Sequence, residues 1–437
     1  MASRWQTGDV VEIRIPHANS GRTVRIGAFI GHGATADVFE ATDDAHDPEL
    51  AHIALKIYKI EPPSDLEDFV EHARTNQLDK IPPLLIDDGN QMTTEYSPVA
   101  APIFVIYGHR TDIVGVAVLR IDSNRFVPLS DFTRTPLVRD LSVTVYAAQR
   151  LAKTVKHIHE RGYIIGDFSD TNILIDRAGY VSLIDCDPYG TEEPSRSARD
   201  ATVNWRAPET ALALEASQKS DLFILAVHCL KLLLGGASPF DGVDPQNDTN
   251  SPQANIDSGR SWLWIEEMRV PGPQFESSRG MKDLPDYLAE AILNLLSQDP
   301  QDRRSTAVLL EKSLIRCRQE LFNSPCGHTT FRSIGCTTCR SGTVSSVERL
   351  VAPPTRKRTP KNVPQAGSQK SGSSSSQTEN AGNQSSKPPA STSAPPSLNS
   401  EKSPLPRSQR TSAFSIWALL IALLLIIAAT VMFMVSK

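Results

Sequence analysis

The chain has 437 residues, a formal net charge of -5 and 40% hydrophobic residues. This length and apolar content suffice for a large folded domain with appended segments, and they exclude a chain that is disordered throughout. The slightly negative charge excludes a protein that binds nucleic acid through bulk positive charge, and no local basic patch occurs in the part predicted to fold. The first residues, MASRWQ, lack the apolar run of a signal peptide, and Ala2 excludes N-myristoylation, so we expect a cytosolic N-terminal part.

Residues 1–24 are predicted to be an N-terminal extension, and the first motif follows at residues 30–39, IGHGATADVF. An apolar run precedes this motif and a second strand-like segment follows it, which predicts two antiparallel strands joined by a turn of small residues. Small side chains let backbone N–H groups approach phosphates closely. An ordinary hairpin turn is the alternative. The candidate phosphate-binding residues are Gly31, Gly33, Ala36 and Val38.

Lys56 lies in the apolar segment IALKI, which predicts a strand. A lysine in this position can bind nucleotide phosphates, whereas the alternative is a lysine on the surface of a strand. The next segment, residues 65–73 (DLEDFVEHA), is predicted to be a helix with two glutamates that could pair with the lysine. We favour Glu71 as this partner, because the longer reach places it near the middle of the helix, and Glu67 is the alternative.

Residues 151–162, LAKTVKHIHERG, have the apolar spacing of a helix and end at a glycine. The segment that follows contains Asp167, then Asn172 five residues later, and Asp185 eighteen residues after Asp167. A carboxylate that accepts a proton from a hydroxyl, followed by an amide and a second carboxylate that bind magnesium, is the arrangement of a phosphoryl-transfer site.

Together these motifs resemble the eukaryotic-type (Hanks-type) protein kinase superfamily over about residues 25–315. The resemblance implies an α+β fold of two lobes, a β-rich N-lobe over about 25–121 and a helical C-lobe over about 122–315. It implies ATP and Mg²⁺ as cofactors, with Mn²⁺ as an alternative metal, and proteins bearing serine or threonine as substrates. The departures described below make the chain most similar to bacterial membrane-anchored serine/threonine protein kinases.

The resemblance implies a role for each residue at the centre of the site. Asp167 is the expected catalytic base, and Lys56 is expected to hold the nucleotide phosphates during catalysis. Asn172 and Asp185 are the expected magnesium ligands. Asp221, in the segment KSDLFILAV, is expected to hold the backbone of the loop that carries Asp167.

Three departures from the family pattern occur around these residues. Ile165-Gly166 replaces the usual His-Arg, so activation is not expected to depend on a phosphorylated loop that docks beside the catalytic base. Cys186-Asp187 replaces the usual Phe-Gly after the metal-binding aspartate. Ser169 occupies the catalytic-loop position of a lysine that contacts the γ-phosphate, which implies modest turnover.

Residues 202–209, TVNWRAPE, resemble the end of a kinase activation segment. Glu209 is predicted to form a structural ion pair with Arg303. Thr202 is typical of serine/threonine kinases, whereas Trp205 is closer to the tyrosine kinases. We favour serine and threonine as the acceptors. A catalytically weak pseudokinase that acts as a nucleotide-binding membrane scaffold is the competing interpretation, and a small-molecule kinase is the third.

Residues 316–345 are predicted to form a small module with a structural zinc site. Its candidate ligands are Cys326, His328, Cys336 and Cys339. The CTTC spacing and the nearby CGH suit tetrahedral coordination by thiolates and an imidazole. Reduced thiols without a metal and a redox switch are the alternatives, and Cys317 is a possible substitute ligand.

Residues 346–412 are rich in Ser, Pro, Gln and Lys and are predicted to be a disordered, basic tether. Residues 416–435 are uncharged and almost entirely apolar, which predicts a transmembrane helix, with a buried core helix as the alternative. Only two residues follow this helix, so we expect a tail-anchored, single-pass protein. The basic tether predicts that the kinase domain is cytoplasmic, on a membrane that the resemblance suggests is the bacterial cell membrane.

Overall fold

The computed structural model describes residues 5–43, 48–80, 97–108, 112–191, 196–198, 205–211, 215–243, 245, 251–265, 268 and 279–336. These residues all lie in one compact unit, residues 1–351. The predicted tether at 346–412 and the predicted membrane helix at 416–435 lie outside the described residues. Within the described part of the chain, no helix has both the length and the apolar character needed to cross a bilayer.

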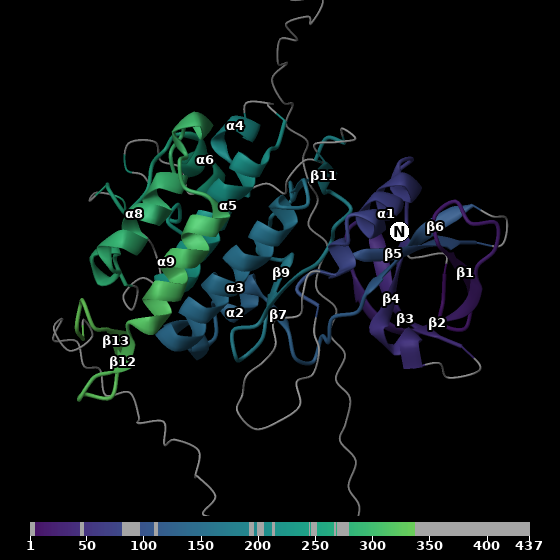
Figure 1. The fold of residues 1–437 in the computed structure, drawn as a ribbon, viewed down its shortest axis with the longest axis horizontal. Coiled ribbons are helices and arrows are strands. Elements are labelled where there is room, and N and C mark those ends of the chain that lie inside the picture. The colour runs from purple at the N-terminus through teal and green to yellow at the C-terminus, as the bar shows by residue number, and fades with distance from the viewer. Residues whose placement is uncertain are drawn as a thin grey trace, which may run out of the picture. The chain divides into compact units, whose positions relative to one another are not determined.

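The first part of the chain forms a closed barrel of antiparallel strands (Figure 1). Its strands are β1 (Val10–Arg14), β2 (Arg22–His32), β3 (Ala36–Thr42), β4 (Ile53–Tyr58), β5 (Pro102–Tyr107) and β6 (Ile113–Leu119). They are hydrogen-bonded in the order β1-β2-β3-β4-β6-β5, and β1 closes the barrel by pairing with β5. The segment predicted to be a separate extension, residues 1–24, therefore contains a barrel strand. The sequence analysis missed this strand because five residues of alternating pattern give a weak signal.

The part of the chain after the barrel is mostly helical, and one further helix, α1, lies between two barrel strands. The helices are α1 (Leu66–Thr75), α2 (Leu129–Phe132), α3 (Leu141–His159), α4 (Pro208–Ala211), α5 (Gln218–Leu233), α6 (Pro252–Asp257), α8 (Asp286–Leu295) and α9 (Ala307–Gln319). Short 3₁₀ turns cover Pro48–His52, Leu78–Lys80, Pro136–Arg139, Met281–Asp283 and Pro300–Asp302. Of these helices, α1 belongs to the barrel part, where it packs against β5.

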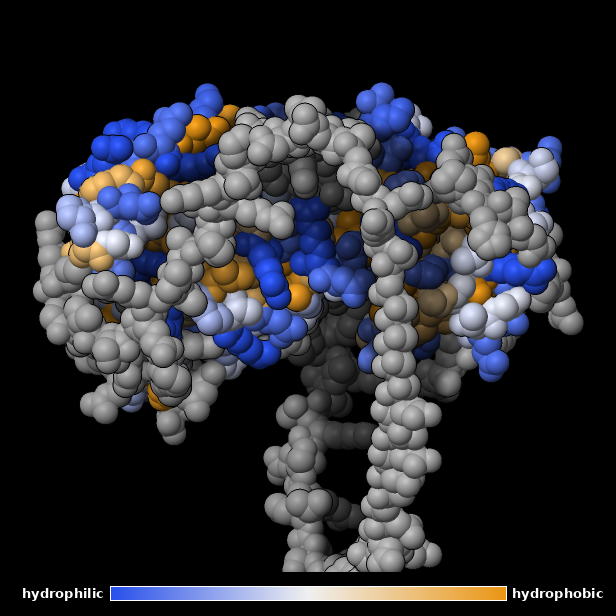
Figure 2. Space-filling model, turned by 90° about the horizontal axis from the view of Figure 1, so that it is seen from below, coloured by the Kyte–Doolittle hydropathy of each residue, from blue (hydrophilic) through white to orange (hydrophobic). Residues whose placement is uncertain are grey.

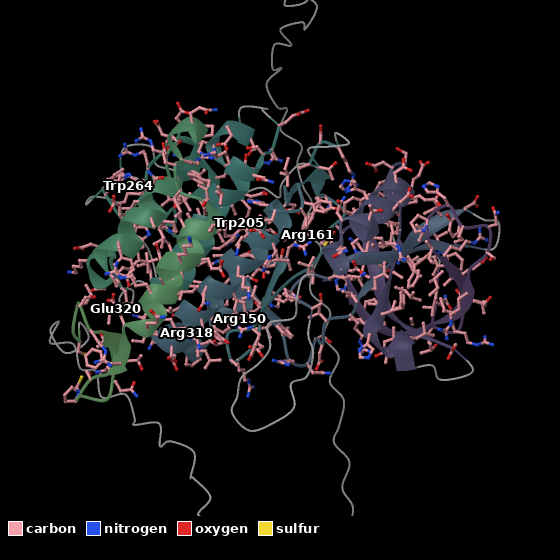
Figure 3. All side chains as sticks on the ribbon, viewed as in Figure 1. Arg150, Arg161, Trp205, Trp264, Arg318 and Glu320 are labelled. Carbon is pink, nitrogen blue, oxygen red and sulfur yellow. The ribbon has the colours of Figure 1, made fainter. Side chains whose placement is uncertain are left out.

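Helix α3 is the central helix, and both α5 and α9 pack against it (Figure 1). It begins where the carboxylate of Asp140 accepts a hydrogen bond from the N–H of Ser142, a favourable helix cap. On the side facing α9, the ring of Tyr146 lies under the guanidinium groups of Arg150 (3.9 Å) and Arg318 (4.3 Å), which are labelled in Figure 3. Helix α5 is buried along almost its whole length, which explains its nearly continuous apolar sequence.

Short strands connect the helices and position the loops of the site. They are β7 (Val127–Pro128), β8 (Tyr163–Ile164), β9 (Ile173–Ile175), β10 (Val181–Leu183), β11 (Gly190–Thr191), β12 (Leu321–Asn323) and β13 (Thr329–Phe331). The pair β9–β10 is an antiparallel hairpin, and β8 pairs with β11. These pairings bring the loop after β8 and the segment after β10 together, although they are separate in sequence.

The described surface carries its exposed large apolar side chains on several elements, such as Phe29 on β2, Trp264 in a turn and Leu309 on α9. On the face shown in Figure 2, hydrophobic and hydrophilic residues are interspersed wherever the described surface is visible. Single exposed apolar side chains are normal on a folded domain and do not by themselves indicate an interface.

Candidate active site

The candidate site is centred on the ammonium group of Lys56, in the middle of β4. Lys56 pairs with Val38 of β3 and with Val116 of β6, so it lies on an interior strand of the barrel. Its Nζ lies 2.6 Å from Oδ1 of Asp185 and 2.8 Å from Oδ2 of Asp187. The structure therefore brings the predicted phosphate-binding lysine to the predicted metal-binding triplet, although 129 residues separate them in sequence.

The predicted phosphate-binding segment forms the turn between β2 and β3. Gly31 pairs with Val38, and the N–H of Gly33 donates to the carbonyl of Ala36 at 2.8 Å. A Cβ atom at Gly31 would meet no heavy atom within 4 Å, so the space beside this backbone is open. The ammonium group of Lys59 donates to the carbonyl of Gly33 at 2.5 Å and holds the turn against the end of β4. The turn geometry thus permits a ligand to approach the backbone closely.

The loop after β8 carries Asp167, and Asp221 of α5 holds its backbone. The Asp221 carboxylate accepts hydrogen bonds from the N–H groups of Ile165 (2.8 Å) and Gly166 (3.1 Å). The imidazole of His159 lies 3.0 Å from the same carboxylate. The predicted role of Asp221 is therefore confirmed, since a buried carboxylate with these partners fixes the loop in one conformation.

Asn172 links the loop that carries Asp167 to the triplet that begins at Asp185. Its side-chain amide donates to the carbonyl of Asp167 at 3.2 Å, and its own carbonyl accepts a hydrogen bond from the N–H of Ile184 at 3.0 Å. Asp185 has a left-handed backbone conformation with a φ of 62°. Such a conformation is strained for a residue with a side chain and persists where the surroundings impose it, as often occurs at functional sites.

The Lys56 ammonium group is in contact with two carboxylates, which affect its pKa. Burial alone would lower the pKa of the Lys56 ammonium, but the carboxylates of Asp187 and Asp185 outweigh burial and raise it. The pKa of Asp185 is raised by its own burial, against the opposing effect of Lys56 and with the added repulsion of Asp187 and Asp167. Asp185 is therefore repelled by two other carboxylates, and such an environment favours an added cation.

Ser169 is buried within the loop that carries Asp167, and its hydroxyl lies 2.9 Å from that of Thr171. The next residue, Asp170, forms an ion pair with Lys231 of α5 at 2.7 Å. The ion pair attaches the loop to α5, as does the 2.7 Å contact between His228 of α5 and the carbonyl of Phe168. The influence of Ser169 on phosphoryl transfer stays a prediction.

The structure does not bring Glu71 or Glu67 to Lys56. Glu71 is on the exposed side of α1, and its carboxylate lies 3.0 Å from the imidazole of His17. The carboxylate of Glu67 accepts hydrogen bonds from the hydroxyl of Tyr107 (2.6 Å) and from the N–H of His17 (2.7 Å). The expected Lys56–Glu71 pair is therefore replaced by pairs with aspartates, because the rotation of α1 turns both glutamates toward the β1–β2 connection and β5.

The end of the predicted activation segment is fixed by a buried ion pair. The guanidinium group of Arg303 donates to both carboxylate oxygens of Glu209, at 2.6 and 2.8 Å, which confirms the predicted pair. The indole of Trp205 lies 4.7 Å from the ring of His228 on α5, and its position is labelled in Figure 3. Thr202 lies outside the described residues.

Cys186 is buried between the two aspartates of the triplet. Its thiol donates to the carbonyl of Ala100 at 3.5 Å, and burial raises its pKa. A protonated, buried thiol of this kind is inert, so the small side chain has a packing role.

The hairpin β12–β13 brings together three of the four predicted zinc ligands. The ligand atoms of Cys326, His328 and Cys336 all lie within 4.8 Å of one another, and Cys336 Sγ lies 3.6 Å from Nδ1 of His328. The fourth predicted ligand, Cys339, lies outside the described residues. Cys317 is buried in α9 and is not part of this group, so the structure does not support it as the substitute ligand.

The sequence analysis missed several residues that contact the site. Tyr58 donates a hydrogen bond to the carboxylate of Asp187, and a signal for it was available because it lies two residues after Lys56, on the same face of the strand. Arg196 had no local signal. Its guanidinium group donates to Asp65 before α1 (2.7 Å) and to the carbonyls of Asp187 (3.0 Å) and Tyr189 (2.7 Å), so it joins the activation segment to α1.

Part of the chain is similar to known protein kinases. Residues 129–315 match the family described as "Protein kinase domain", which implies a two-lobed kinase fold that uses ATP and Mg²⁺. The described residues agree with this fold in having a β-rich part followed by a mainly helical part.

The curated relatives are kinases that match over short regions. Protein kinase C zeta type of Oryctolagus cuniculus is 26% identical over 197 residues, which cover 43% of this chain and 28% of the relative. Protein kinase YegI of Escherichia coli (strain K12) is 25% identical over 24% of this chain and 18% of the relative. Serine/threonine-protein kinase SMU1 of Mycosarcoma maydis is 26% identical over 20% of this chain and 12% of the relative. The chain therefore spans less than a third of the length of each.

Proposed function

We propose that this protein transfers the γ-phosphoryl group of ATP to serine and threonine hydroxyls of proteins. The observation that carries the proposal is the contact of Lys56 with Asp185 and Asp187, next to a loop in which Asn172 is hydrogen-bonded to the backbone of Asp167. This arrangement combines a cation for the nucleotide phosphates, carboxylate and amide oxygens for magnesium, and a carboxylate for the acceptor hydroxyl.

Each of these residues then has a separate task. Lys56 would bind phosphate oxygens, while Asn172 and Asp185 would hold Mg²⁺, which supplies charge neutralisation at the phosphates when it is bound. The residues fit this ion, because the Asp185 carboxylate is partly exposed, the backbone of Asn172 is hydrogen-bonded to the adjacent Ile184, and carboxylate and amide oxygens are hard ligands of the kind that Mg²⁺ takes. Asp167 would orient the acceptor hydroxyl and take its proton. Specificity for serine and threonine is supported by Thr202 and by relatives that are serine/threonine-protein kinases.

The purified full chain, incubated with ATP and Mg²⁺, tests this proposal by phosphosite mapping. We expect modified serine or threonine, with Thr191, Ser195, Ser197 and the Ser-rich tether as the expected sites of autophosphorylation. Phosphate mainly on tyrosine would contradict the substrate class. Tight ATP binding without transfer to any protein would instead support the membrane scaffold, the second candidate, which the Ile165-Gly166 replacement and the absence of a contact between Glu71 and Lys56 favour.

We also propose that the hairpin β12–β13 holds a structural zinc ion. Two cysteine sulfurs and one imidazole already lie within 4.8 Å of one another, and tetrahedral zinc needs one more ligand, for which Cys339 has the right spacing from Cys336. Such an ion would fix the end of the kinase domain, since closed sites of this kind contribute to folding rather than to chemistry.

Metal analysis of freshly reduced protein should find about one zinc ion per chain, because four-ligand sites bind one ion tightly. Cys336→Ser should lose the zinc and increase hydrogen exchange around residues 321–331 while phosphoryl transfer continues. Cys317→Ala is the matched control, and it should keep the zinc because Cys317 is packed in α9 away from the group. Wild-type protein without zinc would end this proposal.

We further propose that residues 416–435 attach the kinase domain to a membrane, with the domain on the cytoplasmic side. The support is the apolar sequence of this segment and the basic residues of the tether before it. The full chain should remain with membranes in high salt, and deletion from residue 413 onward should release it with unchanged phosphoryl transfer to a soluble peptide. A deletion of residues 366–385 within the tether is the control and should leave the protein on the membrane.

A further inference from the structure

Lys56 has two carboxylate partners in this structure, and one of them, Asp185, is also the predicted magnesium ligand. Asp185 is the first residue of the triplet and the predicted magnesium ligand, at 2.6 Å from the Lys56 ammonium. Asp187 is the third residue of the triplet, at 2.8 Å from the same group. The family pattern has a glycine at the position of Asp187, so the resemblance assigns this carboxylate no role.

The surroundings of the two carboxylates differ in a way that separates their tasks. The side chain of Asp185 is 37% exposed, so it is accessible to an ion from solvent. The side chain of Asp187 is only 12% exposed. Its carboxylate also accepts a hydrogen bond from the hydroxyl of Tyr58, which lies on the same strand as Lys56. Asp187 is thus held against β4 by two partners.

The backbone of Asp187 is fixed as well. Its carbonyl accepts a hydrogen bond from the guanidinium group of Arg196 at 3.0 Å, and the same guanidinium group pairs with Asp65 just before α1. The guanidinium group also lies 4.0 Å from the centre of the Phe69 ring on α1. Asp187 therefore has a position that depends on contacts with β4, α1 and the activation segment together.

The glutamates of α1 are engaged elsewhere. Glu67 is hydrogen-bonded to Tyr107 and to the backbone of His17, and Glu71 is more than half exposed beside the His17 imidazole. Moving either glutamate to Lys56 would require α1 to rotate and would break these contacts.

We propose that Asp187, held by Tyr58, is the residue that orients Lys56 toward the nucleotide phosphates, in the position that the resemblance suggests for Glu71. In this arrangement the Asp185 carboxylate binds the metal ion, and the Asp187 carboxylate remains paired with the Lys56 ammonium. The inference rests on the proposed function, because it takes ATP as the ligand, but its test measures ATP binding and not phosphoryl transfer. Asp187 is in this sense a positioning residue, because it acts on the phosphates through Lys56.

The test compares variants of the full chain that remove one negative charge at nearly the same place. Affinities for ATP and for adenosine are measured by titration calorimetry in EDTA, so that metal binding does not contribute. Asp185→Asn should bind metal-free ATP at least as tightly as the wild type, because it removes repulsion from the phosphates and leaves the Lys56–Asp187 pair intact. Asp187→Asn should bind ATP at least about tenfold more weakly than Asp185→Asn, since the lysine loses its orienting partner. Adenosine, which has no phosphates, should bind all variants equally.

Two further variants decide the remaining outcomes. Glu71→Gln tests the competing partner, and a loss of ATP affinity there with none in Asp187→Asn would overturn the inference. If Asp187→Asn also loses affinity for adenosine, the variant has lost its fold and Tyr58→Phe becomes the deciding variant. Tyr58→Phe should bind ATP more weakly than the wild type and adenosine equally well. Unchanged ATP affinity in Tyr58→Phe would then reject the inference. A wild-type protein that binds ATP in this way but transfers no phosphate would reject the proposed function and leave the inference standing.

Discussion

Asp167→Asn should retain ATP binding and lose phosphoryl transfer by about 10²- to 10⁴-fold, the usual contribution of a positioned general base. The carboxylate of Asp167 is expected to act on the acceptor hydroxyl, whereas the nucleotide is expected to be held by Lys56 and Asp185. An amide in the same position keeps the size of the side chain but cannot accept a proton. Transfer to a peptide and affinity for ATP, measured on the same preparation, separate these two effects.

The matched control is Asp131→Asn on α2. Its side chain is more than half exposed and pairs only with Arg134 among the described contacts, so transfer should be unchanged. Lys56→Met and Asp185→Ala should also lose transfer, through the phosphates and the metal ion respectively. Equal transfer by Asp167→Asn and the wild type would remove the basis of the kinase assignment.

Local sequence predicted the elements of the site well where spacing and turn chemistry determine the structure. The glycine-rich segment forms the expected hairpin, because small residues between two apolar runs permit a tight turn. Gly162 follows the end of α3 with a φ of 77°, as the glycine stop predicted. The pair Glu209–Arg303 was also predicted correctly, although 94 residues separate its members, because the resemblance supplied it.

The partner of Lys56 could not be predicted in the same way. A helix sequence gives the spacing of its residues but not its rotation about its axis, which depends on contacts from distant segments. Here His17 from the β1–β2 connection and Tyr107 from β5 determine where the α1 glutamates point. Asp187 was noted only as a departure from the family pattern, since nothing local to the triplet indicates that Tyr58 and Arg196 reach it.

Breaking the buried pair between Glu209 and Arg303 should cost about 3–5 kcal/mol of unfolding free energy, because it leaves one charge buried without its partner. The side chain of Arg303 is 0% exposed, and its guanidinium group also donates to the carbonyls of Ser297 (2.8 Å) and Lys219 (3.0 Å). Arg303→Met therefore removes four hydrogen bonds and leaves the buried Glu209 carboxylate with a hydrogen bond from Ser220 but without its cationic partner. Urea unfolding of the full chain, followed by tryptophan fluorescence, measures the loss.

Two comparisons show whether burial is the cause. Arg134→Met removes the exposed pair with Asp131 by the same chemical change, and it should cost less than about 1 kcal/mol because water screens that pair. The double variant Glu209→Leu with Arg303→Met leaves neither charge buried, so it should be more stable than Arg303→Met alone. A cost for Arg303→Met as small as that of Arg134→Met would show that the pair contributes little to the fold. The end of the activation segment would then depend on the contacts of Trp205 with α5 instead.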